Sequence, residues 1–219
     1  MRVEIDKNLQ EKFDVTGREI RALLDMNKVF LINMISSPGA GKTSLIEKIL
    51  ERHGDRWKIG VIEGDIETDI DAERIRKYGV FVHQINTRSS CHIQPGQLRE
   101  VLSEVDLKGQ DLLFVENVGN LVCPAEVSLG EHLRMVLLSV PEGDEKPLKY
   151  PLAFKTSQVL IISKTDLLEF VDFEPVRVRA AARALNPHMN IFGLSAKRDE
   201  GIDELVRYIE EKMRVHFGK

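Results

Sequence analysis

The chain has 219 residues, of which 42% are hydrophobic and 30% charged, and its formal net charge is −4. This length suits one α/β domain with or without a short extension, and the slight acidic excess gives no sign of a nucleic-acid-binding protein. No apolar run approaches the roughly 18 residues of a membrane-spanning helix, and residues 1–6 carry charges where a signal peptide needs an apolar core. We therefore expect a cytoplasmic protein that binds neither nucleic acid nor membrane, with two cysteines that are thiols or metal ligands.

Strand and helix patterns alternate along the chain. Residues 8–27 have apolar positions at helical spacing, which predicts an amphipathic helix that Gly17 weakens. Expected strands follow at 29–35, 58–63, 80–85, 111–118, 133–140, 157–162 and 191–194, and expected helices at 42–52, 69–78, 95–104, 173–185 and 201–215. Several strands are continuous apolar runs, as strands buried on both faces require. The pattern predicts an α/β fold with a mostly parallel sheet flanked by helices on both faces.

Two local features refine this prediction. Asp172 stands directly before the helix expected at 173–185 and can cap it. Residues 141–156 contain three prolines and mixed charge, so we expect an ordered loop there.

The first strand runs into a glycine-rich segment, SSPGAGKT, at residues 36–43. A P-loop reads G-x-x-x-x-G-K-[ST], and here the first position is serine instead of glycine. Gly39 and Gly41 still let backbone amides turn toward an anion at a helix N-terminus, Lys42 would reach the β- and γ-phosphates, and Thr43 would offer its hydroxyl to Mg²⁺. A glycine turn without a ligand is the alternative, which the order of strand, turn and helix disfavours. The predicted phosphate contacts are Ser37, Gly39, Ala40, Gly41, Lys42, Thr43 and Ser44.

Acidic residues follow two later strands. Glu116 lies in the fourth expected strand and precedes Gly119 by three residues, the spacing with which P-loop proteins contact Mg²⁺ through an acid and the γ-phosphate through a glycine amide. Asp65 follows the second strand, and Asp69 and Asp71 come soon after it. One of these three could ligate Mg²⁺ or orient the attacking water, and by position we favour Asp65. Asp69 and Asp71 are equally well explained as acids in a helix's first turn. The predicted catalytic residues are Lys42, Asp65 and Glu116, and the predicted Mg²⁺ ligands are Thr43, Asp65 and Glu116.

The sixth strand ends in SKTD, residues 163–166, where guanine-selective GTPases carry Asn-Lys-x-Asp. The Asp166 carboxylate would accept two hydrogen bonds from guanine, whereas adenine lacks that donor pair. Lys164 would lie along the purine, and Ser163, in place of asparagine, could brace the loop less well. A second base-side loop is predicted at Ser195, Ala196 and Lys197. In this order after a P-loop, the motifs predict GTP as the ligand.

Cys91 and His92 follow the third expected strand, and Cys123 follows Glu116 by seven residues. Thiolate and imidazole together suit Ni²⁺ or Zn²⁺. A closed structural zinc site uses four ligands, so water, a small ligand or a second copy of the chain would complete this set. The alternative is two buried structural cysteines and an unrelated histidine, but both cysteines follow strands that sense nucleotide, and loss of a γ-phosphate moves such segments. The other histidines show no ligand spacing.

These motifs resemble those of the hydrogenase maturation GTPase family HypB. The resemblance extends over nearly the whole chain, with Ser163 and Arg88 as departures from the usual pattern. It rests on SSPGAGKT (36–43), EGDIETDIDAERI (63–75), HQINTRSSCHI (83–93), ENVGNLVCPAE (116–126), LLSVPEGDEKPLKYP (137–151) and SKTDLL (163–168). It implies a P-loop GTPase of the dimerising class, with an N-terminal helical extension over 1–27 and a GTPase domain with an embedded metal site over 28–219.

The resemblance also implies a GTP-hydrolysing metallochaperone that binds Ni²⁺ or Zn²⁺ at Cys91, His92 and Cys123 and helps to insert nickel into [NiFe]-hydrogenase. Its cofactors would be GTP and Mg²⁺. Expected partners are a second copy in a GTP-promoted homodimer, a HypA-type nickel and zinc accessory protein, and the hydrogenase large-subunit precursor. Intrinsic hydrolysis should be slow, because no arginine finger stands at a defined position.

Three alternatives to this function stay open. One is a GTP-dependent switch that recruits a partner protein, and a second is a urease-type nickel accessory GTPase, although Ala125 stands where a Cys-Pro-His motif would end. The third is a small-molecule P-loop kinase, which would have little need for Asp166. Lys149 is a candidate contact to nucleotide or partner subunit, against the alternative of a solvated lysine.

Overall fold

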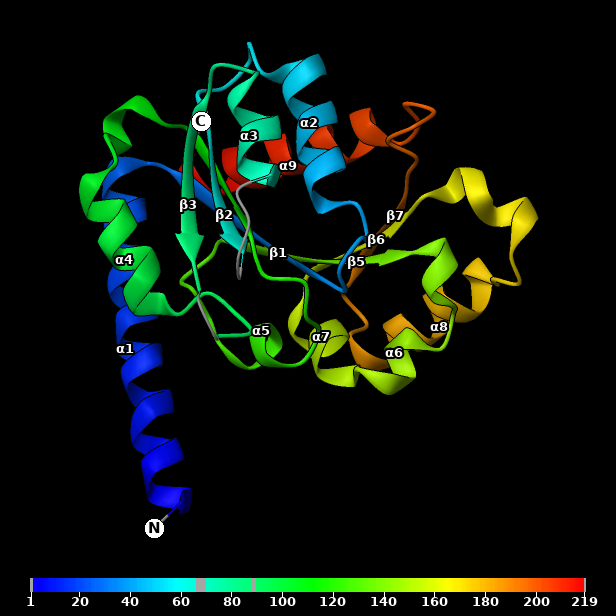
Figure 1. Cartoon of the computed structure of the whole chain (residues 1–219), viewed down its shortest axis with the longest axis horizontal. Helices are drawn as coiled ribbons and strands as arrows, with labels where there is room; N and C mark the ends of the chain where they lie inside the picture. Colours follow the sequence, from blue (N-terminus) through cyan, green and yellow to red (C-terminus); the bar gives the residue numbers. More distant parts are fainter. Residues whose placement is uncertain (1, 66–69, 88–89, 219) are drawn as a thin grey trace.

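The structure is a computed structural model that describes the backbone of residues 2–65, 70–87 and 90–218, and side chains from residue 9 onward within these ranges. One seven-stranded sheet has the order β3-β2-β4-β1-β5-β6-β7, and all neighbouring strands are parallel (Figure 1). The strands are β1 (Phe30–Ser36), β2 (Ile59–Asp65), β3 (Phe81–Asn86), β4 (Leu112–Glu116), β5 (Leu133–Ser139), β6 (Val159–Ser163) and β7 (Asn190–Gly193). The predicted fold class and all seven predicted strands are confirmed.

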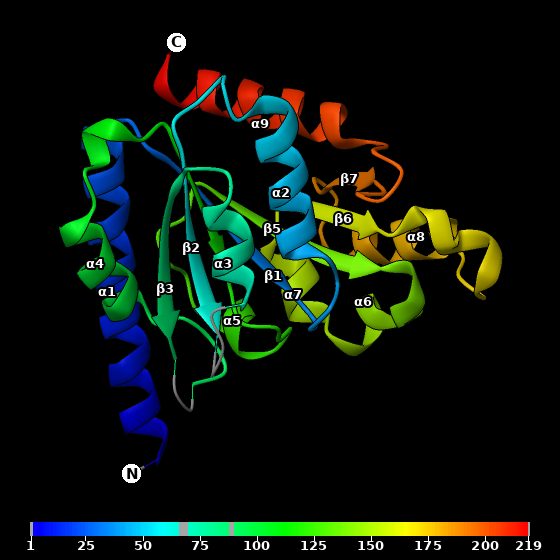
Figure 2. The same ribbon diagram turned by 45° about the horizontal axis from the view of Figure 1, so that its top comes forward.

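Helices cover both faces of this sheet (Figures 1 and 2). One face packs against α2, α3 and α9, and the other against α1, α4, α5, α7 and α8. The α-helices are α1 (Arg2–Asn27), α2 (Lys42–His53), α3 (Ile70–Arg76), α4 (Pro95–Glu104), α5 (Cys123–Glu126), α6 (Lys146–Lys149), α7 (Pro151–Thr156), α8 (Pro175–Leu185) and α9 (Ile202–Phe217). Short 3₁₀ helices lie at η1 (Leu107–Gly109), η2 (Val140–Glu142) and η3 (Thr165–Phe170). Among the described residues no helix is both long and apolar enough to cross a membrane.

Strand β1 shows why its sequence sits at the centre of the sheet. All seven of its residues are buried. Ile32 and Met34 pack under α2 and α9, whereas Leu31 packs on the opposite side under α1. Successive side chains of a strand point to opposite faces, so a continuous apolar run is what a strand covered on both faces needs.

Two predictions of local structure are wrong. Residues 141–156 form most of η2 together with α6 and α7, and not a loop, because Pro147 and Pro151 stand in the first turns of their helices, where proline is tolerated, and Phe154 is buried. Asp172 does not cap α8, which begins at Pro175 with Glu174 at the cap position.

Helix α1 is longer than predicted and packs side by side with α4 (Figure 1). Ile20 and Leu24 on its inner side are fully buried. Gly17 does weaken helix propensity, but a Cβ there would lie 3.0 Å from the carbonyl oxygen of Ser128. The glycine therefore lets the helix approach the segment before β5 closely.

Candidate functional site

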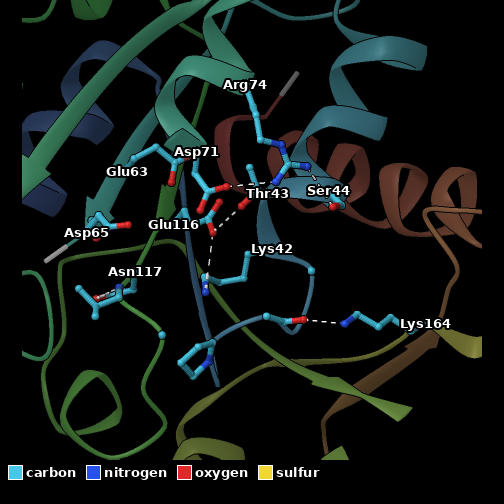
Figure 3. Close-up of a pocket in the computed structure, with 16 residues that line it drawn as sticks. Lys42, Thr43, Ser44, Glu63, Asp65, Asp71, Arg74, Glu116, Asn117 and Lys164 are labelled. Atoms are coloured by element: carbon cyan, nitrogen blue, oxygen red, sulfur yellow. Dashed lines mark hydrogen bonds and ion pairs between the residues drawn. The ribbon is translucent and has the colours of Figure 1, made fainter. Parts of the chain in front are cut away.

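The P-loop joins β1 to α2 at the carboxyl edge of the sheet (Figure 3). Gly39 and Gly41 have φ values of 72° and 97°, a region open to glycine at little cost. The Lys42 ammonium donates to Ser36 Oγ at 3.0 Å and lies 3.7 Å from Glu116 Oε1. The serine in the first P-loop position thus holds the lysine that is predicted to bind phosphate.

Two buried carboxyl groups lie opposite each other below the P-loop. Glu63 and Glu116 are paired in the register of β2 and β4, and the Thr43 hydroxyl donates to Glu116 Oε1 at 2.9 Å. Burial and the neighbouring Glu116 raise the pKa of Glu63 to about 10, so at neutral pH Glu63 is protonated and donates a hydrogen bond to Glu116. Burial also raises the pKa of Glu116. The position of Glu63 opposite Glu116 depends on this register, so the motifs alone do not indicate it.

The acid pair has two oxygen atoms without a partner in the described part of the chain. Glu63 Oε1 and Glu116 Oε2 are buried and have no hydrogen-bond partner within the part of the chain that the structure describes. Carboxylate and hydroxyl oxygens are the ligands that Mg²⁺ prefers. The Glu116 carboxylate and the Thr43 hydroxyl beside it therefore form a pair of donors that fits Mg²⁺.

A cavity of about 440 Å³ gathers the P-loop, both glutamates and the segment after β4. Asp65 and Asp71 also line it, whereas Asp69 lies outside the described residues. Arg74 donates to Asp71 at 3.1 Å and to Ser44 Oγ at 3.2 Å (Figure 3), and it pairs with Glu47 on α2. The structure therefore adds an arginine to this cavity that the sequence motifs did not indicate.

A second cavity, of about 400 Å³, adjoins the first and shares Gly41, Ser44 and Lys164 with it. Its lining includes Asp166, Ala196 and Lys197. The Ser195 hydroxyl donates to Asp166 at 2.6 Å and lowers the pKa of this carboxylate. The residues predicted to bind the base are thus brought together beside those predicted to bind the phosphates.

Ser163, which replaces the usual asparagine, still braces the P-loop. Its hydroxyl donates to the carbonyl of Ala40 at 2.6 Å, and Lys164 donates to the carbonyl of Gly39 at 2.7 Å. The shorter side chain therefore retains a direct link between β6 and the P-loop.

A lysine outside the motifs also reaches the P-loop. Lys146 in α6 donates to Ser37 Oγ at 3.1 Å. Lys149, the lysine that the sequence analysis selected, pairs with Glu145 and keeps 63% of its side chain exposed. Among the described residues, then, it is Lys146 and not Lys149 that contacts this loop.

Cys91, His92 and Cys123 come together near this edge of the sheet, each with one ligand atom within 4.8 Å of the others. Cys91 Sγ lies 3.8 Å from His92 Nδ1, and both thiols are free. His92 Nε2 is buried and has no partner among the described residues, and burial lowers the pKa of His92, which keeps the ring neutral as a metal ligand must be. Burial and the neighbouring Cys123 raise the pKa of the Cys91 thiol, so metal binding there would release a proton.

Asp25, His132 and His216 form a second cluster that meets the same distance criterion. His132 Nε2 and His216 Nε2 lie 2.9 and 2.7 Å from Asp25 Oδ1. His132 Nδ1, however, accepts the backbone N–H of Leu31 at 2.9 Å. A neutral ring that accepts at Nδ1 carries its proton on Nε2 and has no lone pair there for a metal. We interpret this cluster as a hydrogen-bonded link between α1, α9 and the start of β5.

Comparison with known proteins places this arrangement in a family. The model of the CobW/HypB/UreG nucleotide-binding domain matches residues 30–193, which include the P-loop, Glu116 and the Cys–His–Cys set. The hydrogenase maturation factor HypB of Azotobacter vinelandii is 42% identical over 210 residues, which are 96% of this chain and 69% of that one. This chain belongs to the HypB family. The resemblance seen in the motifs is therefore confirmed.

Solved structures of HypB proteins agree with the fold. The crystal structure of HypB from Helicobacter pylori in complex with nickel matches with a TM-score of 0.89 and 37% identity, and the match covers 94% of this chain and 97% of that one. HypB from Archaeoglobus fulgidus matches with a TM-score of 0.87 and 32% identity, over 93% of this chain and 99% of that one.

Proposed function

We propose that this HypB-family protein is a GTP-hydrolysing metallochaperone that binds Ni²⁺ or Zn²⁺ and assists nickel insertion into [NiFe]-hydrogenase. The observation that carries the proposal is the position of the Cys91, His92 and Cys123 set. Cys123 follows Glu116 by seven residues, so it lies on the continuation of the segment that lines the phosphate cavity. The same cluster contains His92, whose buried Nε2 has no partner among the described residues.

The nucleotide would occupy both cavities. Asp166 would select guanine, and Lys164 and the 195–197 loop would hold the purine. The phosphates would lie on the P-loop amides, with Lys42 leaving Ser36 for the β- and γ-phosphates. Thr43, Asp65 and Glu116 would hold Mg²⁺, which when bound neutralises charge on the phosphate oxygens. The lining arginine is already paired with two carboxylates, so we expect slow intrinsic hydrolysis.

Nickel or zinc is cargo in this proposal. Three ligands from one chain leave at least one position open in a four-coordinate shell, so the ion can be handed to another protein. We propose a homodimer that GTP promotes, a HypA-type accessory protein as metal partner, and the hydrogenase large-subunit precursor as recipient. We also propose that residues 1–27 are an N-terminal extension to a GTPase domain over 28–219, and that the protein acts in the cytoplasm.

The test is equilibrium dialysis of Ni²⁺ and Zn²⁺ against the full chain, with GDP and with a non-hydrolysable GTP analogue. We expect stoichiometric binding by the parent and loss of this binding in Cys123→Ala. Ser103→Ala is the matched control, because it makes a change of similar size at an exposed position of α4, where the hydroxyl bonds the carbonyl of Glu100. Equal binding by Cys123→Ala and the parent would leave a GTP switch with structural cysteines as the better function.

A second measurement separates the kinase alternative. We expect GTP to bind more tightly than ATP, and Asp166→Ala to remove that preference, since its carboxylate supplies the acceptors for guanine. Equal affinities for GTP and ATP in the parent would contradict a guanine-specific site.

A further inference from the structure

A buried asparagine connects the phosphate cavity to the metal-binding loop. Asn117 directly follows β4 and is 2% exposed. Its Oδ1 accepts the backbone N–H of Ile93 at 3.1 Å and that of Val118 at 3.0 Å. Ile93 is the residue after His92, so the loop that carries Cys91 and His92 is hydrogen-bonded to the segment that follows Glu116.

A second asparagine reaches the rest of the metal set. Asn120 Nδ2 donates to the carbonyl of Cys91 at 3.4 Å, and its Oδ1 accepts the N–H of Val122, the residue before Cys123, at 2.9 Å. Its backbone pairs with Ser36 of the P-loop in an isolated bridge. One side chain therefore touches both segments that supply cysteine, while its backbone is joined to the phosphate site.

Gly119, one of the two residues between these asparagines, lies against the P-loop. A Cβ on Gly119 would come within 2.8 Å of Pro38, so only a glycine allows this approach. A phosphate that displaced Pro38, or that drew the Gly119 amide toward it, would therefore shift the backbone at residues 117–120.

The other end of α5 (Cys123–Glu126), the short helix that begins at Cys123, is held by Arg134. Arg134 donates to the carbonyl of Ala125 at 3.1 Å and to that of Val127 at 2.7 Å. Its Nε donates to Glu131 at 2.6 Å, and both side chains are buried. Helix α5, which begins at Cys123, thus has a fixed end at Arg134 and an end that follows Asn120.

From this arrangement we propose that Asn117 and Asn120 are positioning residues that make the geometry of the Cys91, His92 and Cys123 set depend on the nucleotide. Metal–ligand distances in proteins lie within about 0.2 Å of their usual values, so a small shift of residues 117–120 against the fixed end of α5 would alter the ligand geometry and with it the metal affinity. The inference rests on the proposed metal-binding function and names the side chains through which nucleotide state acts on it.

The experiment measures the Ni²⁺ Kd of the full chain by competition with a chromophoric chelator, once with GDP and once with a non-hydrolysable GTP analogue. Coupling between two sites typically changes affinity by about 5- to 150-fold, and we expect the parent's two Kd values to differ within this range. In Asn120→Ala we expect the two values to become equal. Asn190→Ala is the matched control: this asparagine bonds Tyr208 at the far edge of the sheet, and its loss should leave the parent's ratio intact.

Asn117→Ala extends the test, with equalised Kd values as the expected result. The thermal unfolding of Asn117→Ala is recorded first, because the substitution leaves the N–H groups of Ile93 and Val118 without their acceptor. If this variant does not fold, Asn120→Ala decides alone. An Asn120→Ala variant that keeps the parent's ratio, or that binds Ni²⁺ more weakly by the same factor in both nucleotide states, would overturn the proposal. The same nickel Kd for the parent with GDP and with the GTP analogue would also overturn this proposal, but the proposed metal-binding function would stand. If the parent binds no nickel at all, the proposed function itself is wrong.

Discussion

Two three-residue clusters in this molecule look alike by distance and differ in their hydrogen bonds. In both, one potential ligand atom per residue lies within 4.8 Å of the others. The Cys91, His92 and Cys123 cluster follows the carboxyl ends of β3 and β4, whereas the Asp25, His132 and His216 cluster lies where β5 begins. Closeness of metal-binding residue types alone therefore does not identify a metal site.

The position of the ring proton separates the two clusters. His132 accepts a backbone N–H at Nδ1 and faces Asp25 with Nε2, so both ring nitrogens are used. His92 has a buried Nε2 without a partner among the described residues, which is costly unless a ligand satisfies it. His132 therefore uses both ring nitrogens in hydrogen bonds within the fold, whereas His92 keeps a nitrogen free to bind a metal.

The largest expected effect comes from removing the available histidine. We predict that His92→Ala lowers Ni²⁺ affinity by at least ~100-fold, because even the loss of residues that only support a metal ligand costs about 10- to 100-fold. His216→Ala is the matched control and should leave the Kd unchanged. Chelator competition at pH 7 measures both. A comparable loss of affinity in His216→Ala would show that the second cluster also binds nickel.

The same comparison shows what sequence could predict. The alternation of strand and helix patterns is enough to predict the fold. The P-loop at residues 36–43 and the SKTD segment at 163–166 are contiguous motifs, so their order along the chain predicts where the nucleotide binds. Cys91, His92 and Cys123 could be grouped because each follows a strand, and parallel strands end at one edge of the sheet.

What sequence could not predict depends on pairing between distant segments. Glu63 meets Glu116 only through the register of β2 and β4, and Lys146 lies 109 residues from the serine that it contacts. Asp25, His132 and His216 come from three separate parts of the chain, and only the folded structure brings them together. The helices within 141–156 escape prediction for a different reason, because a proline that starts a helix is hard to distinguish in sequence from one that ends a helix.

A pH titration of stability tests the interpretation of the second cluster. Burial lowers the pKa of His132 to about 4, below the ~6.5 of an unfolded chain. Between these values the unfolded state binds more protons, so stability should fall as pH drops, by about 2–3 kcal/mol between pH 7 and ~4.5. Urea unfolding at a series of pH values measures this.

The matched variant for the titration is His132→Gln, whose amide can still donate toward Asp25 but does not titrate. We expect a shallower loss of stability in this variant over the same pH window. Parallel curves for the variant and the parent would place the acid sensitivity elsewhere, for instance among the carboxylates.

The smallest expected effect concerns the acceptor that the two histidines share. Asp25→Ala leaves the nearly buried His132 Nε2–H without its carboxylate, and a buried donor that loses its partner costs about 1–3 kcal/mol. Because His216 is partly exposed and can turn to water, we predict a loss of about 1–2 kcal/mol in the free energy of unfolding. Nickel affinity should not change, since this cluster lies where β5 begins, whereas His92 follows the carboxyl end of β3. If Asp25→Ala instead weakened nickel binding and left stability intact, the carboxylate would be a ligand after all, and the proton position inferred for His132 would be wrong.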